Sequence, residues 1–262
     1  MTATIGPYQE GMHGLYNQGL FDFSTTAKHR LGTRRILDDG REFVYCSNTA
    51  AAIAAGTLIS KAQGYQACTV AAADALVNIT GTKKVTYTLT GTPTADLYKD
   101  GWLVVSAGPG LGQMHKIIGN TADDDPAAGR CTFNLFDPII TDQTTATTVS
   151  MWQNPYSSLL LNPAVADLDA TTQETVMGVT TRIVPASRYF WAQVWGLGSV
   201  LLDVAAAAGA EANEMQLVLG VTAGRAGIIA DAAIPGMQII GNTLQSADLT
   251  NATANLVMLQ IG

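Results

Sequence analysis

The stretch YFWAQVWG, residues Tyr189–Gly196, is a short run of aromatic and aliphatic residues that ends at a glycine. A run of this length bounded by turn residues is typical of a β-strand, because helices usually need about ten residues or more. Trp191, Gln193 and Trp195 alternate along it and therefore share one face of the predicted strand. The two indoles are predicted to belong either to the core, which we favour, or to a contact patch on a partner subunit.

Strands of the same kind are predicted along most of the chain. Each is a short run rich in apolar, aromatic or β-branched side chains, bounded by Gly, Pro, Asp or Asn. The clearest are Glu42–Cys46, Tyr98–Ser106, Arg130–Phe136, Thr148–Trp152, Val176–Val184, Ser199–Asp203, Met215–Gly220, Ala226–Ala230, Met237–Ile240 and Asn255–Ile261. Many short strands at close spacing predict an all-β fold, either a β-sandwich or a β-barrel. The regular turns between 81 and 152 indicate an antiparallel meander.

Residues 1–35 are predicted to form an extended N-terminal arm. This segment has glycines and isolated aromatic residues but no sustained period of 2 or 3.6, and its aromatics favour contact with another surface over a plain spacer. An ordinary frayed terminus is the alternative. The residues predicted at an interface are Tyr16, Phe21, Phe23, Arg30, Arg34 and Arg35 from the arm, together with Trp191 and Trp195.

Charge is sparse and unevenly placed along the 262 residues. Charged residues make up 13% of the chain and the net charge is -7, so much of the surface is predicted to be neutral. Five of the fourteen basic residues lie between Lys28 and Arg41. An acidic chain with one basic stretch argues against general nucleic-acid binding, which needs an extended positive footprint. The basic stretch is predicted to grip an acidic protein surface, with a phosphate backbone as the less favoured alternative.

Residue types that carry catalysis or hold metals are few. The three histidines lie singly and the three cysteines (Cys46, Cys68 and Cys131) are widely spaced, so a zinc site is not predicted. The cysteines are predicted to be buried, reduced thiols. No nucleophile elbow occurs, and a triad dispersed along the sequence is the alternative that spacing alone leaves open.

Two segments imitate binding motifs. Trp102–Gly112, WLVVSAGPGLG, places a hydrophobic strand before three glycines, but their GxGxG spacing and the nearby Gly119–Asn120 turn favour a glycine-rich β-turn over a dinucleotide site. Asp123–Asp125 lacks the alternating ligands of an EF-hand, so a solvated hairpin tip is predicted instead of a Ca²⁺ site. The sequence therefore predicts a protein with no catalytic, cofactor-binding or metal-binding residues.

Neither a signal peptide nor a membrane span is predicted. The N-terminus, MTATIGPYQEGMHG, has no charged n-region and no apolar h-region. No run approaches the roughly 20 apolar residues that span a bilayer. The chain is expected to be made in the cytoplasm and not to bind a membrane.

Three features of the sequence resemble tailed-bacteriophage virion proteins, in particular capsid decoration, or cement, proteins. They are the strand pair KDGWLVVSAGPGLGQMHKI, the break NPY and the hairpin GVTTRIVPASRYFWAQVWG, which carries a polar Gln193 inside an aromatic strand. The likeness covers roughly residues 36–240. It implies a β-barrel domain formed by 36–65 with 153–262, and an inserted antiparallel β-domain formed by 66–152. Two tandem domains are the alternative.

The resemblance also implies a function. Such proteins bind the outside of the major capsid protein shell and clamp neighbouring capsomers against internal pressure. The expected partners are the major capsid protein and further copies of this chain, with a homotrimer favoured over a dimer. The expected location is the capsid exterior of the virion. The alternatives are a tail-associated virion protein or adhesin and, less favoured, a β-rich glycan hydrolase.

Overall fold

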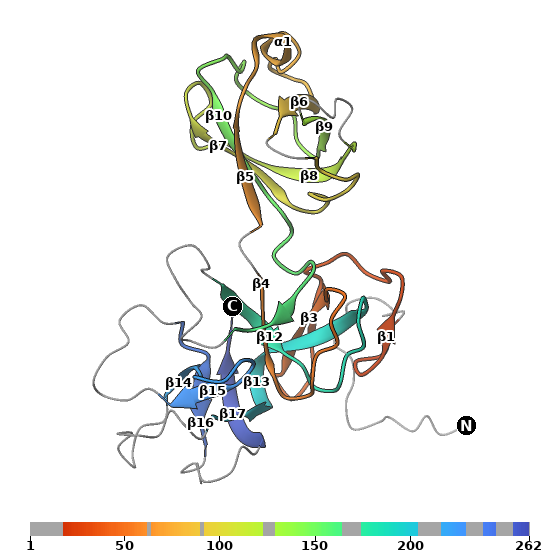
Figure 1. Cartoon of the computed structure of the whole chain (residues 1–262), viewed down its shortest axis with the longest axis vertical. Helices are drawn as coiled ribbons and strands as arrows, with labels where there is room; N and C mark the ends of the chain where they lie inside the picture. Colours follow the sequence, from red (N-terminus) through yellow and green to blue (C-terminus); the bar gives the residue numbers. More distant parts are fainter. Residues whose placement is uncertain are drawn as a thin grey trace. The chain divides into compact units, whose positions relative to one another are not determined.

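The computed structural model describes residues 18–61, 64–89, 92–122, 129–163, 174–203, 216–228, 238–244 and 254–261. Its regular structure is almost entirely β, which confirms the predicted all-β class. The chain divides into two compact units (Figure 1): unit 1 is Met1–Gln63 with Tyr156–Gly262, and unit 2 is Gly64–Pro155. These boundaries lie close to the ones that the resemblance implied, after residues 65 and 152.

Unit 1 is built on one sheet of eleven strands whose named strands all pair antiparallel. They are β1 (Phe23–Ser24), β2 (Arg34–Ile36), β3 (Glu42–Ser47), β4 (Leu58–Lys61), β11 (Leu160–Leu161), β12 (Thr175–Val179), β13 (Tyr189–Leu201), β14 (Gln216–Leu219), β15 (Ala226–Ile228), β16 (Gly241–Thr243) and β17 (Ala254–Gln260). Hydrogen bonding follows the order β11-β4-β12-β13-β17-β16-β14-β15. In addition, β1 and β3 pair with β13, and β2 pairs with β3.

β13 is the longest described strand and joins the two halves of this sheet. Its first half pairs with β3 and its second half pairs with β17. The sequence predicted two strands here, Tyr189–Gly196 and Ser199–Asp203, and this separation is wrong. A Cβ on Gly198 would lie 2.7 Å from the side chain of Leu259. Gly198 therefore makes room for a close contact inside the strand, and Gly196, at which the first predicted strand ended, also lies inside β13.

Alternation along the strands gives the sheet an inner and an outer face. Phe190 and Val194 on β13 and Val257 and Leu259 on β17 belong to the inner face and are buried in the main core of unit 1. Burial of this face is the principal source of stability, because it removes apolar surface from water. The residues between them point to the outer face, on which the candidate functional site lies.

Unit 2 is a six-stranded antiparallel sheet that wraps around its own core. Its elements are β5 (Tyr65–Thr69), α1 (Ala72–Ala75), β6 (Lys84–Thr88), β7 (Trp102–Ala107), β8 (Met114–Asn120), β9 (Arg130–Leu135) and β10 (Thr148–Trp152). The strand order is β5-β10-β7-β8-β9-β6, and the two end strands approach each other. Every strand contributes to the core, in which Leu103, Phe133 and Met151 are fully buried. The sheet therefore forms a small barrel.

The single-turn helix α1 was not predicted from the sequence. Its Asp74 is 1% exposed, and the carboxylate accepts hydrogen bonds from Nη2 and Nε of Arg130 at 3.0 and 3.2 Å. A buried carboxylate needs such a partner, because an unpaired charge away from water is costly. The ion pair therefore ties α1 to β9.

Several strand boundaries also differ from the prediction, and two of them lie in unit 1 at β12 and β16. β12 ends at Val179 instead of Val184, because the hydroxyl of Thr180 donates to the Ala54 carbonyl at 2.6 Å and the chain leaves the strand there. β16 begins at Gly241, just after the predicted strand Met237–Ile240. Both differences lie at ends of strands, where side-chain contacts outside the strand decide the path of the chain.

Candidate interaction surface

The N-terminal segment, residues 18–36, lies along the outer face of unit 1, so the predicted extended arm is wrong for this part of the chain. β1 pairs with β13 and β2 pairs with β3 (Figure 1). The amide nitrogen of Gln18 donates to the Tyr189 carbonyl at 3.0 Å, and its amide oxygen accepts from the Tyr45 hydroxyl at 2.8 Å. The remainder of the predicted arm, residues 1–17, lies outside the described residues.

An aromatic cluster fixes the N-terminal segment on the sheet. Trp191 of β13 is 2% exposed, and its ring lies 5.0 Å from that of Tyr45 and 5.3 Å from that of His29, measured between centroids. Leu20 and Leu31 of the segment pack against the same cluster. The N-terminal segment therefore covers one half of the outer face, which would otherwise expose large aromatic side chains to water.

Two of the predicted interface residues are buried beneath this cover. Arg35 is 4% exposed, and its guanidinium carbon lies 5.8 Å from the centre of the Trp191 ring. Burial lowers the pKa of the Arg35 guanidinium. Trp191 therefore lies in the core, the alternative that the sequence favoured for its indole, and Arg35 is enclosed by its own chain instead of lying on the surface as an interface cation.

The other half of the outer face is not covered by any described residue. Trp195 and Leu197 on β13 and Leu256 on β17 are 46%, 45% and 46% exposed. The register of β13 and β17 places them on one continuous surface, which we call the open face. Neither β17 nor the second half of β13 contains a charged residue. Phe21 lies at its edge, where it lines a pocket of about 400 Å³ together with Leu197 and Leu256.

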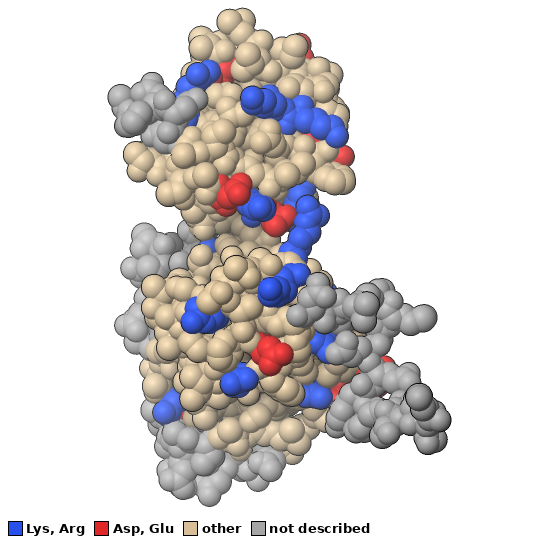
Figure 2. Space-filling model, turned by 90° about the vertical axis from the view of Figure 1, so that its right-hand side faces the viewer, with Lys and Arg blue, Asp and Glu red and all other residues tan. Residues whose placement is uncertain are grey.

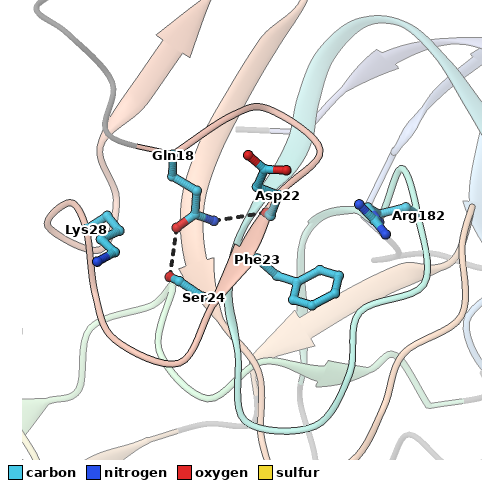
Figure 3. A pocket seen from close by; sticks show the side chains of 6 residues that line it. All are labelled: Gln18, Asp22, Phe23, Ser24, Lys28 and Arg182. Carbon is cyan, nitrogen blue, oxygen red and sulfur yellow. Dashed lines mark hydrogen bonds between the residues drawn. The ribbon is translucent and has the colours of Figure 1, made fainter.

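A second pocket, of about 350 Å³, lies where the N-terminal segment meets Arg182 (Figure 3). We call it the cationic pocket, because Lys28 and Arg182 line it together with Phe23. Figure 3 shows the Phe23 ring directed toward Arg182, whose guanidinium carbon lies 4.9 Å from the ring centre. The same guanidinium donates to the Phe21 carbonyl. Arg182 therefore connects the cationic pocket to the edge of the open face.

Positive charge at the cationic pocket is only partly balanced. Asp22 supplies a carboxylate among the lining residues, but no ion pair joins Lys28 or Arg182 to another described residue. Nearby Arg34 and Arg41, by contrast, each pair with a carboxylate of unit 1, at 3.1 and 2.7 Å. Figure 2 shows Lys and Arg side chains on the displayed face of both units, some of them beside Asp or Glu. Lys28 and Arg182 are thus available to carboxylates of a partner.

The predicted interface residues differ in exposure and in position. Phe21, Phe23 and Trp195 are exposed and lie on or beside the open face and the cationic pocket. Arg30 and Arg34 are also exposed. Tyr16 lies outside the described residues.

Sequence reasoning missed Leu197, Leu256 and Arg182. Leu197 follows Trp195 by two residues, so strand periodicity alone places both on one face. Leu256 and Arg182 have no comparable local signal. They reach the surface only because β17 pairs with β13 and because the N-terminal segment returns to residues more than 150 positions away.

His115 and the three cysteines lie apart from this surface. His115 is 5% exposed inside unit 2, where burial lowers the pKa of its imidazole. The three cysteines are free and buried, as predicted, and burial raises the pKa of the Cys68 thiol to about 12. Among the described residues, no three His, Cys, Asp or Glu side chains gather as metal ligands. The predicted hairpin tip Asp123–Asp125 lies outside the described residues.

His29 is expected to make the attachment of the N-terminal segment depend on pH. Desolvation lowers the pKa of its imidazole below the ordinary value of about 6.5, because the ring lies against Tyr45 and Trp191. The unfolded chain therefore binds the proton more readily than the folded chain. This contribution to stability is present above pH 6.5 and is lost as the pH falls toward the lowered pKa.

We expect hydrogen exchange in residues 18–36 to accelerate between about pH 7.5 and pH 5.5, after correction for the intrinsic rate. The measurement is peptide-resolved exchange followed by mass spectrometry. The His29→Gln variant, which cannot gain the proton, is expected to lack the acceleration. Equal acceleration in both proteins would show that another group is responsible.

Comparisons with protein-family models, with curated proteins and with solved structures give no significant match. None of the helices in the described ranges is both long and apolar enough to cross a membrane. The open face and the cationic pocket are therefore the features on which a functional proposal rests.

Proposed function

We propose that this chain is a bacteriophage virion structural protein, a capsid decoration or cement protein that binds the outside of the major capsid protein shell and bridges neighbouring capsomers. The resemblance of residues 36–240 to such proteins supports the proposal, and the open face supplies a surface for the contact. The role requires no chemical step. It requires contact area between subunits that are already neighbours.

The open face is the observation that carries the proposal. Soluble monomers rarely leave large contiguous apolar surfaces in water, and those that do usually present a binding site. In unit 1 the N-terminal segment covers Trp191 and its neighbours but leaves Trp195, Leu197 and Leu256 about half exposed. Aromatic and aliphatic anchors of this kind form the centre of protein interfaces.

The cationic pocket fits the rim of the same interface. Lys28 and Arg182 lie next to the edge of the open face, so a partner with carboxylates around an apolar patch complements both features. Binding then depends on salt, because exposed charges are screened over about 10 Å at moderate ionic strength. Each contact is small, but many copies on one shell raise the effective concentration and hence the occupancy.

Replacing Leu197 and Leu256 together by Ser is expected to lower the affinity for the shell at least about tenfold, because both leucines would lie at the centre of the contact. The measurement adds the purified chain to shells that lack it and counts bound copies by quantitative mass spectrometry. Val221→Ser is the matched control, since Val221 is 43% exposed but lies in the turn between β14 and β15.

The result separates the proposal from its alternatives. Undiminished binding of the double variant would remove the open face as the capsid contact. A native count of only about six or twelve copies per particle, in place of hundreds, would assign the chain to the tail, whose symmetry is low-order and cyclic.

A further inference from the structure

Unit 2 carries an exposed apolar surface that the proposed function does not use. Its large side chains are between 47% and 80% exposed and come from three segments, 76–82, 108–114 and 136–143. They are Leu76, Val77, Ile79, Leu111, Met114, Phe136 and Ile140. We call this surface the apolar cap. It includes the residues that directly follow α1, which lies at one end of unit 2 (Figure 1).

Hydrogen bonds hold the three segments of the apolar cap side by side. Thr80 donates from its backbone nitrogen and its hydroxyl to the carboxylate of Asp142, both at 2.7 Å. The side-chain amide of Gln113 donates to the Thr141 hydroxyl at 2.8 Å. These contacts flank the exposed side chains, which therefore form one surface and not three separate loops.

The middle segment of the apolar cap is also fixed in shape. Gly108 has a φ of +76°, and a Cβ there would lie 2.2 Å from the carbonyl oxygen of Ala146, so the turn packs directly on the neighbouring backbone. Within the turn, the Leu111 amide donates to the Gly108 carbonyl at 3.1 Å. A surface that is already ordered loses little conformational entropy when a partner binds. The apolar cap is therefore preorganised for association.

The size of the apolar cap matches the centre of a protein interface. A side chain of this kind carries about 60–120 Å² of apolar surface, so the exposed fractions together leave roughly 250–500 Å² open to water. A standard interface buries about 800 Å² per partner, of which somewhat more than half is apolar. The cap alone provides about half or more of that apolar area.

Charge identifies the partner. The three segments contain no Lys or Arg, and their charged residues are Asp137 and Asp142, the second already bound by Thr80. A charged partner would find almost no opposite charge on the cap to pair with. An equally apolar, nearly uncharged surface could instead pack against the cap and bury its side chains. From these observations we infer that the apolar cap is a self-association surface, against which the cap of a second copy of this chain packs.

Contact of cap with cap is compatible with a closed, symmetric oligomer, because each copy presents the same surface to the next around a rotation axis. The contact uses no residue of the open face. The inference stands independently of the proposed function, since it concerns the purified chain alone.

Sedimentation equilibrium of the purified full chain tests this inference. The wild type is expected to form a dimer or a higher oligomer at micromolar concentration. The double variant Leu111→Ser, Ile140→Ser is expected to raise the dissociation constant at least about tenfold. Both side chains are more than two-thirds exposed, so folding does not depend on them, and circular dichroism verifies this. Leu97→Ser, at a side chain that is 38% exposed in unit 2 but outside the three segments, is the matched control.

Each other outcome overturns the inference. A wild type that stays monomeric up to about 100 μM removes self-association at any useful strength. An oligomer that persists in the cap variant but dissociates in the Leu197→Ser, Leu256→Ser variant assigns the self-contact to unit 1. A monomeric wild type whose cap variant binds shells less well assigns the cap to the capsid protein.

Discussion

Replacing Trp191 by Ala is expected to lower the free energy of unfolding of unit 1 by about 3–5 kcal/mol, the usual effect of truncating a fully buried indole. Trp191 is 2% exposed, packs against Tyr45 and His29, and donates its indole N–H to the Gln18 carbonyl at 3.3 Å. Its removal leaves a cavity beneath the N-terminal segment. We therefore expect residues 18–36 to become the first part of unit 1 to lose protection from hydrogen exchange.

The same change at Trp195 is the control, four residues further along β13. Trp195 is 46% exposed, so its truncation removes little buried surface and is expected to cost no more than about 1 kcal/mol. Under the proposed function, it is expected instead to weaken binding to the capsid shell. Urea denaturation followed by circular dichroism measures the first effect, and shell binding measures the second. Equal losses of stability in the two variants would contradict the assignment of Trp191 to the core and Trp195 to the surface.

These two tryptophans show what the sequence alone can predict about the outer face. Alternation places Trp191 and Trp195 on the same face of one strand, and the structure agrees. Alternation says nothing about what covers that face. The cover is the N-terminal segment, whose attachment depends on single anchors such as Gln18 and Leu20. Such anchors contact residues far away in the sequence and therefore leave no local period.

The strands themselves were predicted well where turn residues bound them closely. Thr148–Trp152 is β10 as predicted, and the predicted strand Arg130–Phe136 differs from β9 by one residue. Errors arose where a residue type has two physical uses. Gly196 was taken as the end of a strand, but it lies inside β13, where a Cβ would come within 3.0 Å of the Gly40 carbonyl oxygen. Arg35 was taken as a surface cation, but its aliphatic stem and planar head suit it to lie against a buried indole.

In unit 2 a large loss of stability is expected from Gly101→Ala. A Cβ at this position would lie 2.1 Å from the Trp152 carbonyl oxygen and 2.8 Å from that of Tyr98. Neither side can move away freely, because the Gly101 amide donates to Tyr98 at 2.9 Å and its carbonyl accepts from Ile117 at 3.0 Å. Separating these segments breaks the start of β7 away from β10. We expect the free energy of unfolding of unit 2 to fall by about 3 kcal/mol or more.

Gly81→Ala and Gly112→Ala separate this clash from ordinary backbone strain. Both glycines have positive φ, +88° and +87°, but nothing lies within 4 Å of the position that a Cβ would take. Each substitution therefore costs only the left-handed strain of an L-residue, about 1–2 kcal/mol. Peptide-resolved hydrogen exchange during denaturation measures all three variants, because it reports on unit 2 separately. If Gly101→Ala costs no more than the two controls, β7 and β10 do not pack as closely at Gly101 as the structure has them. If Gly101→Ala lowers the free energy of unfolding by more than the two controls do, glycine is required at position 101 by the close approach of two backbone segments. The sign of φ is then not the reason.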